Sequence, residues 1–160
     1  MPRWTGTWLE GPGVTLGELR SPDTWPGSRL GLPREGRGAV ATFSVRVIAF
    51  LADIAASGLA SGLVLAFLAH PTDKQRQAAG LAVLFVESAL LVALTGQTLG
   101  MRVTGLQVLR LEDPTRVPGL ATGIIRTVPL IASLGLVGFF TKDGRGLHDL
   151  AAGTVVVRSS

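Results

Sequence analysis

Apolar residues along this chain are gathered into three blocks, at Arg46–Leu68, Gln77–Gln97 and Leu120–Phe140. The first two blocks are each about 20 residues long, the length of helix that crosses the hydrocarbon core of a membrane. The connection between them, His70–Arg76, is short and polar, so we expect the two helices to lie antiparallel. The pattern predicts an all-α integral membrane protein built on a small bundle with two spanning helices.

The third block differs from the other two because Arg126 and Pro129 interrupt it. The uncharged run that remains, Thr127–Phe140, has 14 residues, and a run of that length more often re-enters a membrane or lies at its interface than spans it. Residues 118–128 are expected to form an amphipathic interfacial helix that bends at Pro129. The alternative is a third spanning helix over 118–140, with Arg126 paired near the inner interface.

Two short runs rich in valine and leucine lie outside the apolar blocks. Val103–Leu111 is followed by the turn signal Glu112-Asp113-Pro114, and Thr154–Arg158 is the last such run. Because unpaired strand edges are poorly satisfied, we expect the two runs to pair as a hairpin-like sheet in the cytoplasm. This pairing requires both ends of the third block to lie on one side of the membrane, which favours re-entry.

Residues 1–39 form an arm of different composition, with five of the nine prolines and all three tryptophans. No apolar run follows a basic start, so we expect no signal peptide. The composition favours an irregular segment, and the tryptophans leave open a position at the membrane–water boundary. We therefore divide the chain into this arm and a membrane domain at 40–160, with helices at about 40–69, 77–98 and 118–140 and strands at about 103–111 and 154–158.

Charged groups inside the first two blocks are the main candidates for function. Arg46 and Asp53 are seven residues apart and share one helix face, so we predict that they pair. Asp53 and Glu87 are expected at similar depth in the membrane. An ionisable group in lipid costs at least about 2.5 kcal/mol, so each should face protein or water. Two interpretations of these charged groups stay open. They form polar contacts that fix helix packing, or they form a site for a proton, an ion or a small ligand.

Small residues in the first block point to close helix contact. Gly58, Ser61 and Gly62 occur at helix-neighbour spacing and are expected to form the face that meets a second helix.

The adjacent pair His148-Asp149 suggests a metal site at first sight. No further histidine or spaced acid cluster supports one, since His70 lies in a distant loop. The sequence also holds no phosphate loop, nucleophile elbow or metalloprotease helix signature. We therefore expect no enzyme activity, no metal and no cofactor. Asp149 is expected near Arg46 or Arg102, or as a helix-capping or turn residue.

Composition agrees with a membrane protein, since 47% of residues are hydrophobic and only 16% are charged. The net charge of +4 suggests nucleic acid, but the basic residues lie beside the apolar blocks, where membrane orientation explains them better. The arm and the 98–118 connection carry eight lysines and arginines, against two in the loop after the first helix. This bias predicts a cytoplasmic N-terminus and no nucleic-acid partner. The absence of cysteine excludes disulfides and thiol chemistry.

Four motifs occur in order over residues 40–158: Arg46 at the start of the first helix, Asp53 within it, a T-x-G-x-R turn at 98–102, and GRGLHDLAAGTVVV at 144–157. In this order they resemble the RDD family of prokaryotic membrane proteins, named for one arginine and two aspartates, which fall here on Arg46, Asp53 and Asp149. The arm, with WLEGP at 8–12 and GLPREGRG at 31–38, is similar to that of actinobacterial members.

The resemblance implies a small multi-pass protein of the cell membrane, without enzyme activity, for which transport of unidentified ligands or cation/proton exchange has been suggested. Glu87 is not part of the family motif. The chain has no internal repeat, so a transporter built from it would have to be a homo-oligomer. We expect an accessory or structural component whose partners are the lipid bilayer and either further copies of this chain or another membrane protein. The alternative is transport of a small ligand or cation/proton exchange. The candidate polar cluster, or ligand site, comprises Arg46, Asp53, Glu87, Arg102, Arg126, His148 and Asp149.

Overall fold

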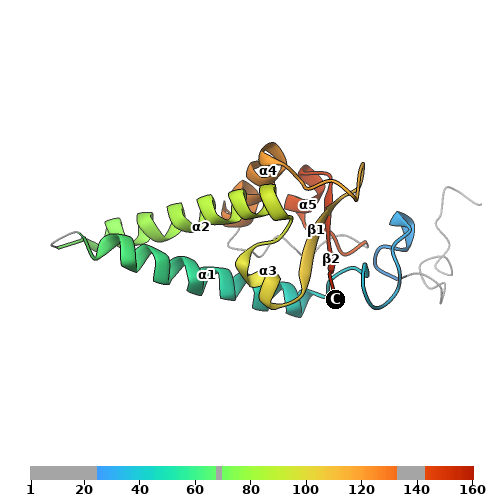
Figure 1. Cartoon of the computed structure of the whole chain (residues 1–160), viewed down its shortest axis with the longest axis horizontal. Coiled ribbons are helices and arrows are strands. Elements are labelled where there is room, and N and C mark those ends of the chain that lie inside the picture. The colour runs from blue at the N-terminus through green and yellow to red at the C-terminus, as the bar shows by residue number, and fades with distance from the viewer. Residues whose placement is uncertain (1–24, 68–69, 133–142) are drawn as a thin grey trace, which may run out of the picture.

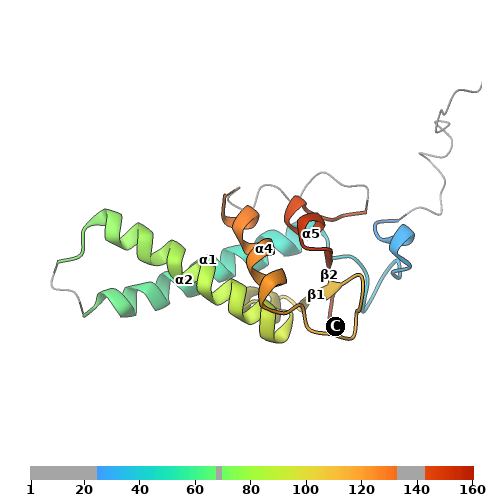
Figure 2. The same ribbon diagram turned by 90° about the horizontal axis from the view of Figure 1, so that it is seen from above.

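A computed structural model describes residues 25–67, 70–132 and 143–160. Two long helices, α1 (Phe43–Leu65) and α2 (Asp73–Thr95), form an antiparallel hairpin (Figure 1). We call its two ends the loop end, where α1 leads into α2, and the sheet end. The other elements gather toward the sheet end (Figures 1 and 2): η2 (Ser28–Leu30), α3 (Leu99–Val103), β1 (Leu106–Arg110), α4 (Leu120–Ala132), α5 (Leu147–Ala151) and β2 (Thr154–Arg158).

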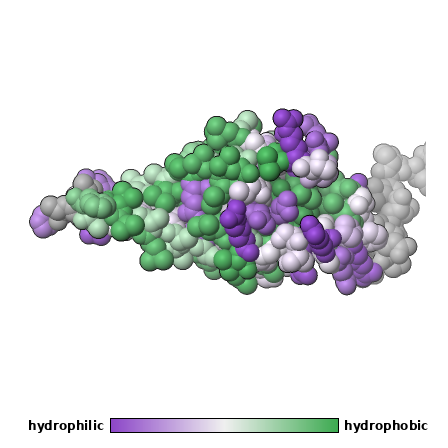
Figure 3. All heavy atoms as spheres, viewed as in Figure 1, coloured by the Kyte–Doolittle hydropathy of each residue, from purple (hydrophilic) through white to green (hydrophobic). Residues whose placement is uncertain are grey.

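The outer surface of the hairpin is apolar. Both helices are long and apolar enough to cross a membrane, and only 22% and 28% of their most apolar windows is buried inside the chain. Leu59, Leu63 and Phe67 are 79%, 69% and 87% exposed. Figure 3 shows hydrophobic atoms along the hairpin and hydrophilic atoms at its loop end and around the sheet end. An apolar surface of this extent is characteristic of a protein that contacts lipid or a partner rather than water.

The inner face of α1 carries small and polar side chains. The buried residues recur every four positions, at Ala49, Asp53, Ser57, Ser61 and Leu65. The expected contact face of Gly58, Ser61 and Gly62 is therefore only partly right. The two glycines are exposed, with open space in front of them, because each lies one residue, about 100° of helix rotation, beyond the buried row.

Local signals at both ends of α2 fix its length. The Thr72 side chain accepts a hydrogen bond from the Gln75 amide, and the Gln75 side chain accepts one from the Thr72 amide. This capping box starts the helix at Asp73, four residues before the predicted start. At the other end Gly96 takes a left-handed conformation with φ of 73° and ends the helix.

The two strands pair antiparallel, in a register that runs from Leu106 opposite Arg158 to Arg110 opposite Thr154. This confirms the predicted pairing, although β1 starts later than expected because α3 occupies Leu99–Val103. The pairing has a topological consequence. Since β1 precedes the third apolar block and β2 follows it, the described segments on both sides of that block lie at the sheet end of the hairpin.

Residues 39–41, where the arm meets the membrane domain, form an additional edge of this sheet that the sequence did not indicate. Val40 makes a β-bridge to Val157, the Ala41 amide donates to the Val156 carbonyl at 3.0 Å, and the Arg158 amide donates to the Ala39 carbonyl at 2.9 Å. The strand β2 thus lies between β1 and the segment that leads into α1. Residues 1–24 of the arm, with Trp4 and Trp8, lie outside the described residues.

The third block forms α4, which packs against α2. The helix does not end at Pro129 but continues through this proline to Ala132, and its contact with α2 supports the turn that lacks the proline amide. Nor does α4 have the polar outer face of an interfacial helix, since Arg126 and Thr127 are buried and Ile125 is exposed. The stretch 133–140, on which the choice between spanning and re-entry depends, lies outside the described residues.

Candidate functional site

Asp149 is the centre of a buried ionic cluster at the sheet end. Its side chain is 0% exposed. One carboxylate oxygen accepts from Arg46 Nη1 at 3.1 Å and the other accepts from Arg126 Nη1. The first oxygen also accepts from the Gly146 amide at 3.1 Å, so Asp149 stabilises the start of its own helix, α5. Both expected roles, partner of Arg46 and helix-capping residue, are therefore carried by the same side chain.

The two arginines connect this carboxylate to the rest of the fold. Arg46, on α1, also donates from Nε to the Ala41 carbonyl at 3.1 Å and from Nη2 to the Val156 carbonyl at 3.2 Å. Arg126, on α4, donates from Nη1 to Thr154 Oγ1 at 3.2 Å. The cluster thus links both helices to the strand β2. We call Arg46, Arg126, His148 and Asp149 the Asp149 cluster.

A third arginine, Arg145, stands beside this cluster. Its Nε donates to the Thr154 carbonyl at 2.9 Å and its Nη2 to the Asp149 carbonyl at 3.3 Å. Arg145 therefore holds the backbone by hydrogen bonds on both sides of the turn between α5 and β2. Its guanidinium group also adds a positive charge beside the cluster.

Burial and charge act in opposite directions on Asp149. Burial alone would raise the pKa of its carboxyl, but the positive charges of Arg126 and Arg46 and the hydrogen bond from the Gly146 amide hold the pKa below its usual range. The neighbouring His148 behaves differently, because burial and the charge of Arg126 lower its pKa to about 4. His148 is therefore neutral at neutral pH. Its Nε2 lies 3.6 Å from Asp149 Oδ1, which is too long for a hydrogen bond.

Asp53 occupies a separate site built from neutral donors. Thr98 Oγ1 donates to one carboxylate oxygen at 2.7 Å, and the Gly100 amide donates to the other at 2.6 Å. Thr98 also caps α3 by accepting from the Met101 amide at 3.2 Å. A Cβ at Gly100 would collide with the Ala49 carbonyl, so only glycine lets this amide reach Asp53. These contacts explain why threonine and glycine stand at their places in the T-x-G-x-R turn.

The predicted ion pair between Arg46 and Asp53 is wrong. Seven residues of helix separate the two by about 10 Å along the axis, which is too far for direct contact. Each side chain instead takes a nearer partner from another element, Arg46 from α5 and Asp53 from α3.

Arg102 lies apart from these two sites, whereas Glu87 lies beside the Asp53 site. Ser57 Oγ donates to Glu87 Oε2 at 2.8 Å, one helical turn along α1 from Asp53. The other oxygen of Glu87 is buried and has no hydrogen-bond partner among the residues that the structure describes. Arg102 is exposed on the surface of α3.

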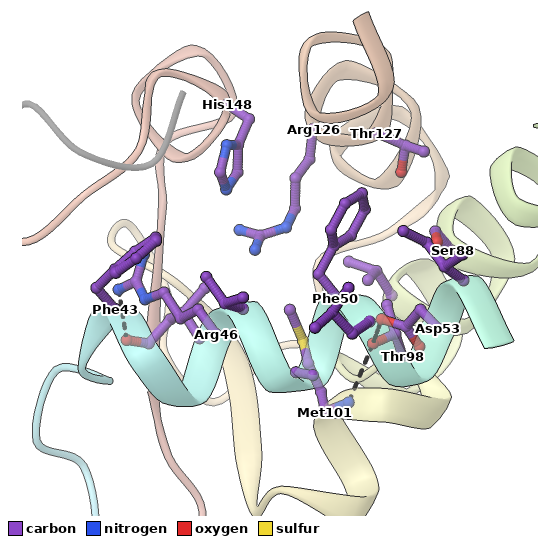
Figure 4. Close-up of a pocket in the computed structure, with 16 residues that line it drawn as sticks. Phe43, Arg46, Phe50, Asp53, Ser88, Thr98, Met101, Arg126, Thr127 and His148 are labelled. Atoms are coloured by element: carbon purple, nitrogen blue, oxygen red, sulfur yellow. Dashed lines mark hydrogen bonds between the residues drawn. The ribbon is translucent and has the colours of Figure 1, made fainter. Parts of the chain in front are cut away.

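A pocket of about 260 Å³ opens between α1, α4 and α5. Figure 4 shows Arg126 and His148 directed into it from α4 and α5, opposite the side chains of α1, with Asp53 and Thr98 away from His148. Of the candidate residues, Arg46, Asp53, Arg126 and His148 line the pocket, and Asp149 is bonded to two of these lining side chains. Much of the remaining wall is apolar, with Phe50, Val92, Met101 and Val156.

Several contributing residues were not predicted for these sites. Ser57 could have been found, because it is one helical turn from Asp53 on the same face. Arg145 belongs to the segment that carries His148 and Asp149, but nothing in its sequence position indicates that it holds the backbone. Thr154 reaches Arg126 only once β2 is in place, so no local pattern could reveal it.

The fold and the site define a membrane-type protein with two apolar helices and a buried Arg/Asp cluster. Within residues 25–67, 70–132 and 143–160, no group of three or more His, Cys, Asp or Glu side chains could hold a metal ion. The RDD family model matches residues 40–153, and the chain belongs to the RDD family. Neither a curated protein nor a solved structure matches the chain. The matched region includes both aspartate sites and leaves out the arm.

Proposed function

We propose that this protein is an accessory or structural component of the cell membrane, in which the Asp149 cluster fixes the helix hairpin to the small sheet. The observation that carries this proposal is the buried Asp149 carboxylate, which joins Arg46 of α1 to Arg126 of α4. Removing one partner of a buried ion pair typically costs about 3–5 kcal/mol, because the other charge is left without compensation. A link of this kind holds one relative position of the elements it joins.

The hydrogen bonding of both aspartates supports an accessory role over transport. A carboxylate that binds and releases an ion in each cycle must exchange its partners. Asp149 accepts from two guanidinium groups and a backbone amide, and Asp53 accepts from a hydroxyl and a backbone amide. Such partners favour a fixed geometry at both sites.

A flux assay tests this proposal. Purified protein in liposomes should give Na⁺, K⁺ and H⁺ fluxes equal to those of protein-free vesicles, both for the native chain and for Asp53→Asn. A protein-dependent flux that disappears in Asp53→Asn, while the variant keeps its native helix content, would overturn the accessory role.

We further propose that the sheet end and the N-terminus face the cytoplasm. The sheet end carries Arg102, Arg110 and Arg116, whereas the loop end carries Lys74 and Arg76, and lysine and arginine concentrate on the cytoplasmic side of membranes. The chain has no cysteine, so Ser159→Cys and Lys74→Cys form a matched pair. On intact cells an impermeant thiol reagent should label only the cysteine at position 74; the opposite pattern would reverse the orientation.

The alternative function is cation/proton exchange by a homo-oligomer. One observation favours it, the buried oxygen of Glu87 that has no partner within the described part of the chain. Exchange activity that is lost in Glu87→Gln and kept in Glu112→Gln, a matched change at an exposed position, would establish this alternative in place of the accessory role.

A further inference from the structure

The pocket between α1, α4 and α5 contains a polar atom that the fold leaves without a partner. His148 is 6% exposed, and its Nδ1 is buried with no hydrogen-bond partner among the described residues. Figure 4 shows the imidazole directed into the pocket beside Arg126. A buried nitrogen is normally hydrogen-bonded in a native protein, so Nδ1 is available to pair with a group that occupies the pocket.

The charge around the pocket favours an anion. Among the side chains that line the pocket, the guanidinium groups of Arg46 and Arg126 face one carboxylate, that of Asp53. The lining therefore carries one more positive than negative charge in a largely buried region, where charge is screened poorly. Arginine is well suited to phosphate and carboxylate groups because its planar guanidinium presents paired donors.

The apolar wall of the pocket indicates that the anion carries a hydrophobic tail. Phe50 and Met101 line the interior. At the rim the pocket includes Phe43, Leu51 and Ile54, which are 44%, 58% and 44% exposed on the outer face of α1. This outer face belongs to the apolar surface of the hairpin (Figure 3), so the pocket connects the buried cations to the surface that contacts lipid.

We propose that this pocket binds an anionic amphiphile with a single negative charge, whose phosphate or carboxylate headgroup lies at Arg126 and His148 and whose tail lies along α1. His148 Nδ1 forms a hydrogen bond with the headgroup, and the guanidinium groups of Arg46 and Arg126 face its negative charge. The amphiphile thereby occupies a side of the Asp149 cluster that opens toward the apolar surface of the hairpin.

The inference goes beyond the proposed accessory role and does not depend on it. A flux measurement reports whether ions cross the membrane, and it leaves the occupancy of this pocket unaffected. The two proposals can therefore fail separately.

Histidine NMR tests the proposal directly, because the chain has two histidines and His70 is exposed in the loop that leads into α2. Full-length protein labelled with ¹⁵N-histidine, in an uncharged detergent, is titrated with dihexanoyl phosphatidylglycerol. We expect a saturable shift of the His148 side-chain nitrogen resonances and no shift at His70. Dihexanoyl phosphatidylcholine has the same tails without net charge and should leave His148 unchanged, as should inorganic phosphate at the same concentration.

Two variants give an independent measure of affinity. His148→Leu removes the imidazole that hydrogen-bonds with the headgroup and should lower the affinity for the anionic lipid about tenfold, which corresponds to about 1.4 kcal/mol. His70→Leu is the matched control and should leave the affinity unchanged. Should His148→Leu fail to fold, the titration of the native protein still decides the question.

Three results would contradict the proposal. An unchanged His148 spectrum at saturating phosphatidylglycerol would exclude the site. Equal shifts with phosphatidylcholine would exclude selection for a negative charge. Saturation by inorganic phosphate at the same concentration would make this a site for free anions, without a role for the tail.

Discussion

Asp53 and Asp149 are both buried in this fold, yet the protein stabilises them in different ways. Asp149 is held by Arg46 and Arg126, so its charge is balanced by opposite charge. Asp53 is held by the Thr98 hydroxyl and the Gly100 amide, which are neutral donors. The difference follows from position: Asp149 lies where three separate elements and the sheet meet, whereas Asp53 fixes a single short helix, α3, against α1. An ion pair connects distant parts, and a set of neutral hydrogen bonds fixes a local turn.

Loss of the charge on Asp149 should have the largest effect. Asp149→Asn leaves two buried guanidinium groups without their counter-charge, so we expect the free energy of unfolding in detergent to fall by about 3–5 kcal/mol. Thermal melting of the purified variant measures this loss. A decrease below about 1 kcal/mol, the range of an exposed ion pair, would contradict the role we assign to the cluster.

Acid should weaken the Asp149 site through His148. The pKa of His148 is about 4 in the folded protein, against an ordinary value of 6.5. Between these two values the unfolded chain binds a proton that the folded chain does not, so the stability due to this group is present above pH 6.5 and falls as the pH is lowered toward 4. At about 1.4 kcal/mol per unit the loss reaches about 3 kcal/mol.

Melting curves recorded between pH 7.5 and pH 4.5 test this dependence on native protein and on His148→Gln. The slope in this range should be smaller in the variant. Equal slopes would show that His148 does not differ in pKa between the folded and unfolded states.

The close approach of α3 to α1 should make Gly100 intolerant of a side chain. Gly100→Ala places a methyl group against the Ala49 carbonyl and displaces the amide that donates to Asp53, so we expect a loss of about 1–3 kcal/mol. Gly58→Ala on the exposed face of α1 is the matched control, because nothing lies within 4 Å of its added Cβ. If both changes have the same effect on the melting temperature, the packing described for α3 is incorrect.

Removing only the charge of Asp53 should have the smallest effect of the series. Asp53→Asn keeps an oxygen that can accept from Thr98 or Gly100 and loses the second acceptor, so we expect a decrease of about 1–2 kcal/mol. The same melting assay measures it. A loss as large as that of Asp149→Asn would remove the distinction between an ionic and a neutral site.

The hydrophobic pattern was sufficient to predict the hairpin, since α1 and α2 follow from local apolar runs, although the capping box at Thr72 starts α2 four residues earlier than the pattern indicated. The pairing of β1 with β2 was also predictable, because the chain offered two short strands. The partners of the buried charges were not. Arg46 and Asp149 are 103 residues apart, and helical spacing within α1 pointed to Asp53 instead. The edge formed by Val40 carried no strand signal, and the course of α4 through Pro129 depends on its contact with α2.

A double-mutant cycle between Arg46 and Asp149 tests the central claim most directly, because it isolates the coupling between the two side chains from the cost of each change. The variants Arg46→Gln, Asp149→Asn and the combination are compared by their free energies of unfolding in detergent. The cycle of Arg102→Gln with Asp149→Asn serves as the control, since Arg102 is exposed on α3. We predict a coupling of about 1–3 kcal/mol for Arg46 with Asp149 and a value near zero for Arg102 with Asp149. Zero coupling in both cycles would contradict the account and leave Asp149 with its capping role alone.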